Sequence, residues 1–167
     1  PPPRLPWTFT FGLQATPVKD IAGWRKWRMQ PGIHPNLEII WPTPEVIRYY
    51  GYPEPTDPER YRALVKDRHA AGLAVVPYSQ LNGISGQAPE WSFYREEWTN
   101  GATDPGSADV VAYGGSAFYG CSPTQDWIDF IVWANDRYVR EYDLDGLYHD
   151  WTLVMPSSNR LAGCGYL

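Results

Sequence analysis

The stretch DLDGLYHDW, residues 143–151, places a histidine and an acid at the end of a short apolar segment. Strand alternation sends Asp150, together with Tyr148, to one side of such a strand and His149 to the other. A carboxylate at the last position of a strand is held rigidly and partly desolvated, which suits a nucleophile or a general base. From spacing alone, Asp150 either has such a chemical role or caps the turn that follows.

Two other apolar runs end in groups that could join this acid. Tyr78 and Gln80 close the run LAVVPYSQ, and Trp41 comes near the end of LEIIWP. If these runs are neighbouring parallel strands, one edge of the sheet gathers a ring, a hydroxyl, an amide and a carboxylate. Packing in a core would explain the rings, but it explains Gln80 and Asp150 poorly.

The elements that must position these residues have clear signals. Asp57 suits a helix N-cap, Pro58 the first helical position and Gly72 the stop. A second helix is predicted to begin with a capping box of Ser122 and Gln125 and to run to about Tyr142. Residues 20–29 have a weak helical periodicity. The predicted strands are residues 8–17, 37–42, 73–80 and 146–151.

Strands and helices that alternate with short helix-to-strand joints indicate an α/β fold. The order predicts parallel (β/α) units of a TIM-type barrel within a single domain, residues 1–167. Four strands are half of a (β/α)8 barrel, which typically needs about 250 residues. We therefore expect either a partial barrel, whose other half is missing, or a smaller open sheet.

The segment 81–121, between the third strand and its helix, is far longer than the usual loop of about 2–6 residues. It is rich in aromatic side chains, among them Trp91 and Trp98, with polar and acidic residues between them. A long loop in a compact domain is either functional or disordered. This composition favours an ordered lid or wall over the site.

Composition limits the function classes. Nine Trp and twelve Tyr provide more rings than a core needs, and flat apolar rings are surfaces on which sugars pack. A net charge of −5 with no basic patch argues against nucleic-acid binding. No apolar run approaches the roughly 20 residues that span a bilayer, so we expect a soluble chain without a membrane partner.

Metal and cofactor sites are not expected. No set of His, Asp and Glu residues has metal-ligand spacing, and no phosphate-binding glycine loop or GxSxG motif is present. The two cysteines, Cys121 and Cys164, lack CxxC spacing. They form either one disulfide or two free thiols.

The residues also resemble a known family. The string DGLYHDW looks like the fourth strand of retaining glycosidase barrels, in which an Asp that closes the strand is the catalytic nucleophile. The strings FTFGLQATPVK, YYGYP, HAAGLAVVPYSQLNGIS, YGCSP and GCGY resemble a little-characterised group of bacterial polysaccharide-degrading proteins related to glycoside hydrolase family 123. Family 123 uses an adjacent Asp-Glu pair, whereas the corresponding dipeptide here is His149-Asp150 or Asp150-Trp151.

The resemblance implies a secreted or periplasmic glycoside hydrolase that acts on a polysaccharide or oligosaccharide without a cofactor. Asp150 would be the nucleophile or general base. The residues expected to contact the sugar are Trp41, Tyr78, Gln80, Trp91, Trp98, Tyr148, His149 and Trp151. Two alternatives stay open: a noncatalytic glycan-binding or scaffold protein on the same fold, or a half-barrel that functions only with a second chain completing the barrel.

Overall fold

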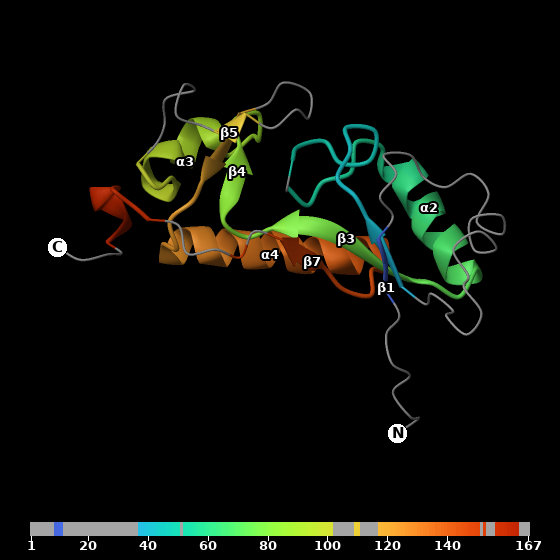
Figure 1. Ribbon diagram of the computed structural model, residues 1–167. Helices are drawn as coiled ribbons and strands as arrows, with labels where there is room; N and C mark the ends of the chain where they lie inside the picture. Colours follow the sequence, from blue (N-terminus) through green and yellow to red (C-terminus); the bar gives the residue numbers. More distant parts are fainter. Residues whose placement is uncertain are drawn as a thin grey trace.

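The computed structural model describes residues 37–50, 52–101, 117–150, 152 and 156–163, and the backbone alone of 9–11 and 109–110. Figure 1 shows the course of the chain. The strands are β1 (Phe9–Phe11), β2 (Leu37–Ile40), β3 (Ala74–Gln80), β4 (Gly83–Ser85), β5 (Asp109–Val110), β6 (Ala117–Gly120) and β7 (Tyr148–Asp150). The helices are α2 (Pro58–Ala70), α3 (Trp91–Trp98), α4 (Gln125–Tyr142) and the 3-10 helix η2 (Arg160–Ala162).

Four strands form a parallel sheet in the order β1-β2-β3-β7. Each of the four predicted strands contains one of them, although the observed strands are shorter than the predicted ones. The α/β class with parallel strands is therefore confirmed. The predicted helix over 20–29 lies outside the described residues.

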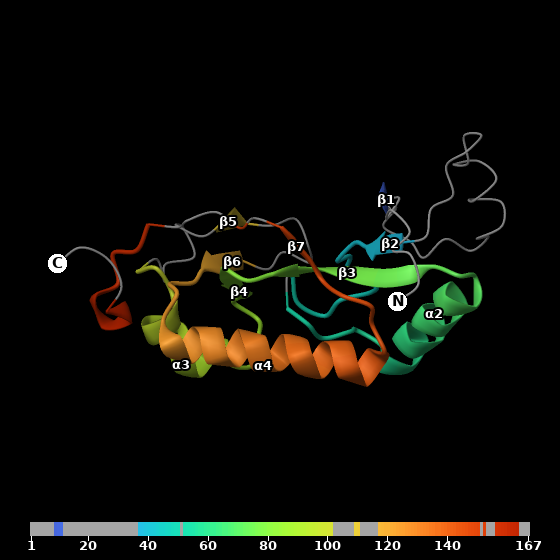
Figure 2. The same cartoon turned by 90° about the horizontal axis from the view of Figure 1, so that it is seen from below.

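Helices α2 and α4 cover the same face of this sheet, as Figure 2 shows. They pack on it through one core cluster, in which Val75 and Ile40 of the strands contact the helix residues. The remaining buried members of the cluster are Val46, Ile47, Tyr61, Val65, Tyr138, Tyr142 and Leu144. Because β-strand side chains alternate between faces, this packing fixes which residues of β3 and β7 point away from the helices.

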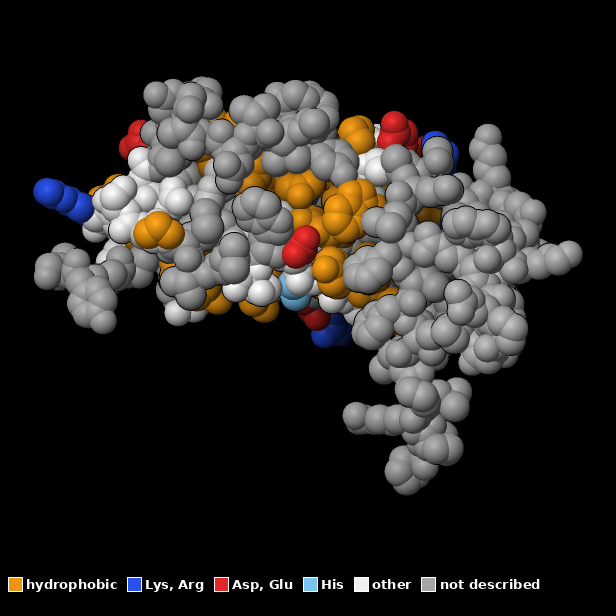
Figure 3. Space-filling model, in the orientation of Figure 1, with side chains coloured by type: hydrophobic (Ala, Val, Ile, Leu, Met, Phe, Trp, Pro, Cys, Tyr) orange, Lys and Arg blue, Asp and Glu red, His pale blue; other side chains and the backbone are white. Residues whose placement is uncertain are grey.

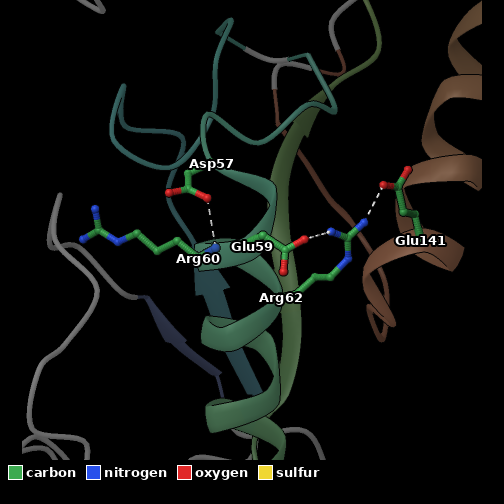
Figure 4. A network of polar contacts seen from close by, with 5 residues as sticks. All are labelled: Asp57, Glu59, Arg60, Arg62 and Glu141. Atoms are coloured by element: carbon green, nitrogen blue, oxygen red, sulfur yellow. Dashed lines mark hydrogen bonds and ion pairs between the residues drawn. The ribbon is translucent and has the colours of Figure 1, made fainter.

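The helix ends are formed by local hydrogen bonds. The Asp57 carboxylate accepts a hydrogen bond from the Arg60 backbone N–H at 3.1 Å and caps α2, as predicted. Figure 4 shows this cap beside an exposed ion-pair network, in which Arg62 joins Glu59 at 3.0 Å to Glu141 of α4 at 2.8 Å. The network ties the first turns of α2 to the end of α4.

Helix α4 corrects one prediction. Its N-cap is Thr124, whose hydroxyl accepts from the Trp127 N–H at 3.2 Å, and not Ser122. Ser122 is buried, and its hydroxyl contacts Ser157 at 2.6 Å and donates to the Thr99 carbonyl at 3.3 Å. The Ser122 side chain therefore joins separate segments of the chain instead of starting the helix.

The turn between α4 and β7 contacts both β3 and α2 through the side chain of Asp145. The Asp145 carboxylate accepts a hydrogen bond from the Val75 N–H at 2.7 Å and lies 2.8 Å from His69 Nε2. It links this turn to β3 and to the end of α2. Asp143 adopts a left-handed conformation at the helix C-cap and is highly exposed, as expected of a turn residue.

The segment 81–121 contains a small sheet of its own. Strands β4, β6 and β5 pair antiparallel in the order β4-β6-β5. Helix α3 packs beside this sheet through a second core cluster, centred on Trp98, Trp127 and Ile131. The described parts of the predicted lid or wall are thus ordered secondary structure that stands next to the carboxyl ends of β3 and β7 (Figure 1).

Candidate functional site

The carboxyl ends of β3 and β7 bring four predicted residues together. The register pairs Tyr78 with Tyr148 and Gln80 with Asp150. All four lie on the sheet face opposite α2 and α4, because Ser79, on the other face of β3, donates a hydrogen bond to Asn135 of α4 at 3.3 Å. The expectation that these strands end side by side is confirmed.

Tyr78 forms a hydrogen-bonded group with Gln80 and with Tyr50. The Gln80 side-chain amide donates to the Tyr78 hydroxyl at 2.6 Å. The Tyr78 and Tyr50 hydroxyls are 3.0 Å apart, and the Gln80 amide nitrogen also reaches the Tyr50 hydroxyl at 3.4 Å. We call Trp41, Tyr50, Tyr78, Gln80, Tyr148 and Asp150 the strand-end cluster.

Rings form much of this cluster. The Trp41 ring centroid lies 4.8 Å from that of Tyr78, at an interplanar angle of 55°. The rings of Tyr148 and Tyr50 lie 6.0 Å and 5.9 Å from Tyr78. Figure 3 shows hydrophobic side chains gathered over the middle of this face, with an acidic side chain beside them. The arrangement offers flat apolar surfaces next to polar groups.

The ionisation of one cluster residue, Tyr78, follows from its surroundings. Burial raises the pKa of Tyr78, and its hydrogen bond with Tyr50 and the negative charge of Asp150 raise it further. The Tyr78 hydroxyl therefore stays protonated and neutral. Gln80 is only 1% exposed and Tyr78 only 3%, so both lie beneath the surface, whereas Tyr50 and Asp150 are partly exposed. Gln80 thus supports the tyrosine hydroxyls from below, which differs from the direct sugar contact that the sequence predicted.

His149 lies on the other face of the sheet. It pairs in register with Ser79, whose hydroxyl contacts α4, so its side chain is directed toward the helices and away from Asp150. Burial lowers its pKa, and its Nδ1 is buried without a hydrogen-bond partner. This position does not suit the predicted contact with a sugar on the Asp150 face.

The predicted tryptophans separate into different environments. Trp98 is 3% exposed and packs in the second core cluster against Tyr94 and Phe130, so its ring has no open face for a sugar. Trp91 is partly exposed and stacks on Tyr119, with ring centroids 3.9 Å apart. Trp151 lies outside the described residues. Trp41 is the tryptophan that the structure places in the strand-end cluster.

Sequence reasoning missed Tyr50 and Phe118. Tyr50 lies in the loop after β2, within the run YYGYP, where nothing in the sequence distinguishes it from its neighbour Tyr49. Phe118, from β6, meets the Tyr50 ring edge-on at 5.4 Å. The segment 81–121 therefore supplies a wall to the cluster through this ring.

No group of three or more His, Cys, Asp or Glu side chains is placed to hold a metal ion in the part of the chain that the structure describes. A pocket of about 410 Å³ lies elsewhere, at the start of α4, lined by Glu97, Thr124, Gln125, Asp126, Leu161 and Ala162. Nor does any described helix have the length and apolar character required to cross a membrane.

Known proteins resemble the chain in fold only. No protein-family model matches it, and no curated protein does. Among solved structures, a noncanonic maltogenic α-amylase, AmyB, from Thermotoga neapolitana is similar with a TM-score of 0.53 and 16% identity over 73% of this chain and 32% of that chain. An enzyme of family GH13_31 has a TM-score of 0.48 and 19% identity over 70% of this chain and 29% of that chain.

The amylase similarity establishes a shared fold with part of a TIM-barrel enzyme, and the second match, with its TM-score below 0.5, adds no argument. The chain spans about a third of the length of the amylase that it matches. Neither match shows glycoside hydrolase family 123.

Proposed function

We propose that the protein is a glycoside hydrolase that acts on a polysaccharide or oligosaccharide bound at the strand-end cluster. The observation that carries the proposal is the register of β3 and β7, which sets Asp150 beside Gln80 and Tyr148 beside Tyr78 at one edge of a parallel sheet. Ligands of such sheets bind at the carboxyl ends of the strands. The fold shared with part of an amylase agrees with this placement.

In this proposal Asp150 is the residue that reacts. Its carboxylate would act as the nucleophile or as the base that activates water. The rings of Trp41 and Tyr148 offer apolar faces to the C–H faces of a sugar, while the tyrosine hydroxyls offer hydrogen bonds. A retaining hydrolase needs a second carboxyl group about 5–5.5 Å from the first. We propose that this group belongs to a part of the barrel supplied by further strands or by a second chain.

The resemblance to the group related to glycoside hydrolase family 123 gives the finer form of the proposal. A bacterial, polysaccharide-degrading role follows from that resemblance. The dipeptides His149-Asp150 and Asp150-Trp151 lack the Asp-Glu pair of family 123, so the proposed mechanism uses Asp150 directly and not a substrate-assisted route.

A test compares the wild type with Asp150→Asn on plant, algal and host-type glycans. We expect the wild type to cleave one class of polymer and the variant to lose turnover by at least roughly 10²–10⁴-fold, because a carboxamide cannot act as base or nucleophile. Asp67→Asn is the matched control, because Asp67 is exposed on α2, on the other side of the sheet. Melting temperatures should be the same for all three proteins.

A noncatalytic glycan-binding protein is the second candidate. The partly exposed rings of Trp41 and Tyr148 favour it, since stacking alone can hold a sugar without any acid. In that case neither wild type nor Asp150→Asn would cleave any glycan, and both would bind the same one. If the Asp150→Asn variant still cleaved the glycan, the catalytic residues would have to lie elsewhere in the protein.

A further inference from the structure

Strand β6 has two faces with different neighbours. Its Tyr119 side chain stacks on Trp91 of α3, with ring centroids 3.9 Å apart. Phe118, the preceding residue, points to the opposite face, because side chains alternate along a strand. There the Phe118 ring meets the Tyr50 ring edge-on at 5.4 Å. The alternation of β6 therefore directs Phe118 from the segment 81–121 to the strand-end cluster.

A glycine makes room for the Phe118 ring. Gly83 of β4 lies just after the end of β3 at Gln80. A Cβ atom at position 83 would overlap Cζ and Cε1 of Phe118 and would lie 2.8 Å from the Tyr119 carbonyl oxygen. The ring therefore lies directly against the backbone of Gly83, in the space that a side chain would fill. Because Phe118 is only 8% exposed, nearly all of its surface is in contact with the protein.

Tyr50 connects Phe118 to the other rings of the strand-end cluster. The Tyr50 ring lies 5.9 Å from that of Tyr78, and the two hydroxyl oxygens are 3.0 Å apart. The rings of Trp41 and Tyr148 pack on the buried Tyr78 ring at 4.8 Å and 6.0 Å. Both of these rings are partly exposed. Phe118 thus lies at the buried end of a row of rings that ends in the two proposed to contact the sugar.

We propose that Phe118 is a positioning residue for sugar binding, which acts on the ligand through Tyr50 and Tyr78 and does not contact it. The inference rests on the proposed function, because it takes the strand-end cluster as the sugar site. The Phe118 ring, packed against Gly83, keeps the Tyr50 ring in place. The contacts that follow keep the exposed rings of the cluster in the arrangement that the sugar meets. The segment 81–121 thereby contributes to affinity without contacting the sugar through this residue.

The experiment measures sugar binding by calorimetry, with maltoheptaose, cellohexaose and laminarihexaose as probes. All proteins are measured well below the lowest melting temperature, so that every variant is folded. Phe118→Leu should raise the dissociation constant of the recognised oligosaccharide about three- to tenfold, because it removes the ring contact that orients Tyr50. A merely structural role would lower the melting temperature and leave this dissociation constant unchanged.

Phe130→Leu is the matched control. Phe130 is a partly buried ring of α4, on the other side of the main sheet, and it stacks on Trp98 with ring centroids 4.8 Å apart. The substitution removes the same kind of ring from the second core cluster, so it should lower the melting temperature without changing the dissociation constant. Phe118→Met, which fills a similar volume without a ring, repeats the test if Phe118→Leu folds poorly.

Kinetics provide a second measurement on any glycan that the wild type cleaves. Phe118→Leu should raise KM by the same factor as the dissociation constant and leave kcat unchanged, because the lost contact affects binding of the ground state and the transition state equally. A fall in kcat with unchanged KM would mean that less of the enzyme is active, and it would overturn the inference.

Two binding results would also overturn the inference while leaving the proposed function intact. One is a dissociation constant for Phe118→Leu that equals that of the wild type. The other is an equal rise for Phe118→Leu and Phe130→Leu, which would show a general loosening of the fold. If the wild type neither binds these probes nor cleaves any glycan of the panel, the proposed function fails and the inference fails with it.

Discussion

At the end of β7, Asp150 and His149 are neighbours in sequence but lie on opposite faces of the sheet. Asp150 stands beside Gln80 and the cluster of rings, whereas His149 is directed toward the helices. The two residues therefore differ in what they can do. The Asp150 side chain lies on the face of the ring cluster, and the His149 side chain lies on the face that packs against the helices.

The partly buried position of His149 makes folding sensitive to pH. Burial holds its pKa below the ordinary value of 6.5 in the folded chain. As pH falls below about 6.5, the unfolded chain binds a proton that the folded chain does not, so the free energy of unfolding decreases. His149→Gln should lose less stability between pH 7 and pH 5 than the wild type in urea unfolding. Equal losses would show that His149 does not contribute.

Cys121 provides a second test at the scale of a single residue. It is a buried free cysteine, and burial raises the pKa of its thiol. Little thiolate is therefore present at pH 8, and reagents have little access to it. We expect alkylation of Cys121 by iodoacetamide, followed by peptide mass spectrometry, to be slow in the native protein and complete in urea. Rapid labelling of the native protein would contradict its buried position. Cys164 lies outside the described residues.

The residue types at the strand ends could be predicted, but their environments could not. Alternation and the apolar runs were enough to bring Gln80 and Asp150 to adjacent strand ends. Tyr50 could not be told from Tyr49, because the loop geometry that turns one ring toward Tyr78 depends on tertiary contacts. Trp98 was expected to stack on a sugar, yet it packs with Trp127 and Phe130 in a core between α3 and α4.

At the scale of the elements, local signals were the most reliable. The Asp57 cap and Pro58 placed the start of α2 correctly, because a cap depends on a few adjacent residues. The N-cap of α4 was predicted at Ser122, but it is Thr124. Both residues precede the helix, and only the buried contacts of Ser122 show that its hydroxyl is bonded elsewhere. The antiparallel strands β4 and β6 were not predicted, because they are short and are defined by their pairing.

The pairing of β4 with β6 requires a glycine at position 83. A methyl group added there would meet the Phe118 ring and lie 2.8 Å from the Tyr119 carbonyl oxygen. Gly83→Ala should therefore destabilise the protein by about 1–3 kcal/mol in urea unfolding. Gly146→Ala is the control, because the nearest atom, of Val76, lies 3.8 Å away and the added methyl group fits. Equal effects of the two substitutions would contradict the close approach at β4.

At the scale of the whole molecule, one flank of α4 stands open. Tyr138 and Ile131 mark the buried side of the helix, and Glu141 meets α2. By the 3.6-residue period, Ile128 and Val132 lie on the flank away from α2, and they are 40% and 61% exposed. Among the described strands, β7 at the end of the sheet pairs with β3 on one side. The open flank and this end of the sheet together form the place where another strand and helix would be added in a barrel.

We therefore expect the isolated chain to associate through this flank, either with a second chain that completes the barrel or with another copy of itself. Val132→Lys should weaken association about tenfold, because it removes an apolar contact worth about 1.5 kcal/mol and adds a charge. Asp129→Lys, a change on the polar side of the same helix, should leave association unchanged. Light scattering over a range of concentrations gives the mass of each protein. A wild type that remains a single chain at all concentrations would show that the flank is an ordinary exposed surface, and the sugar site would then have to function on this sheet alone.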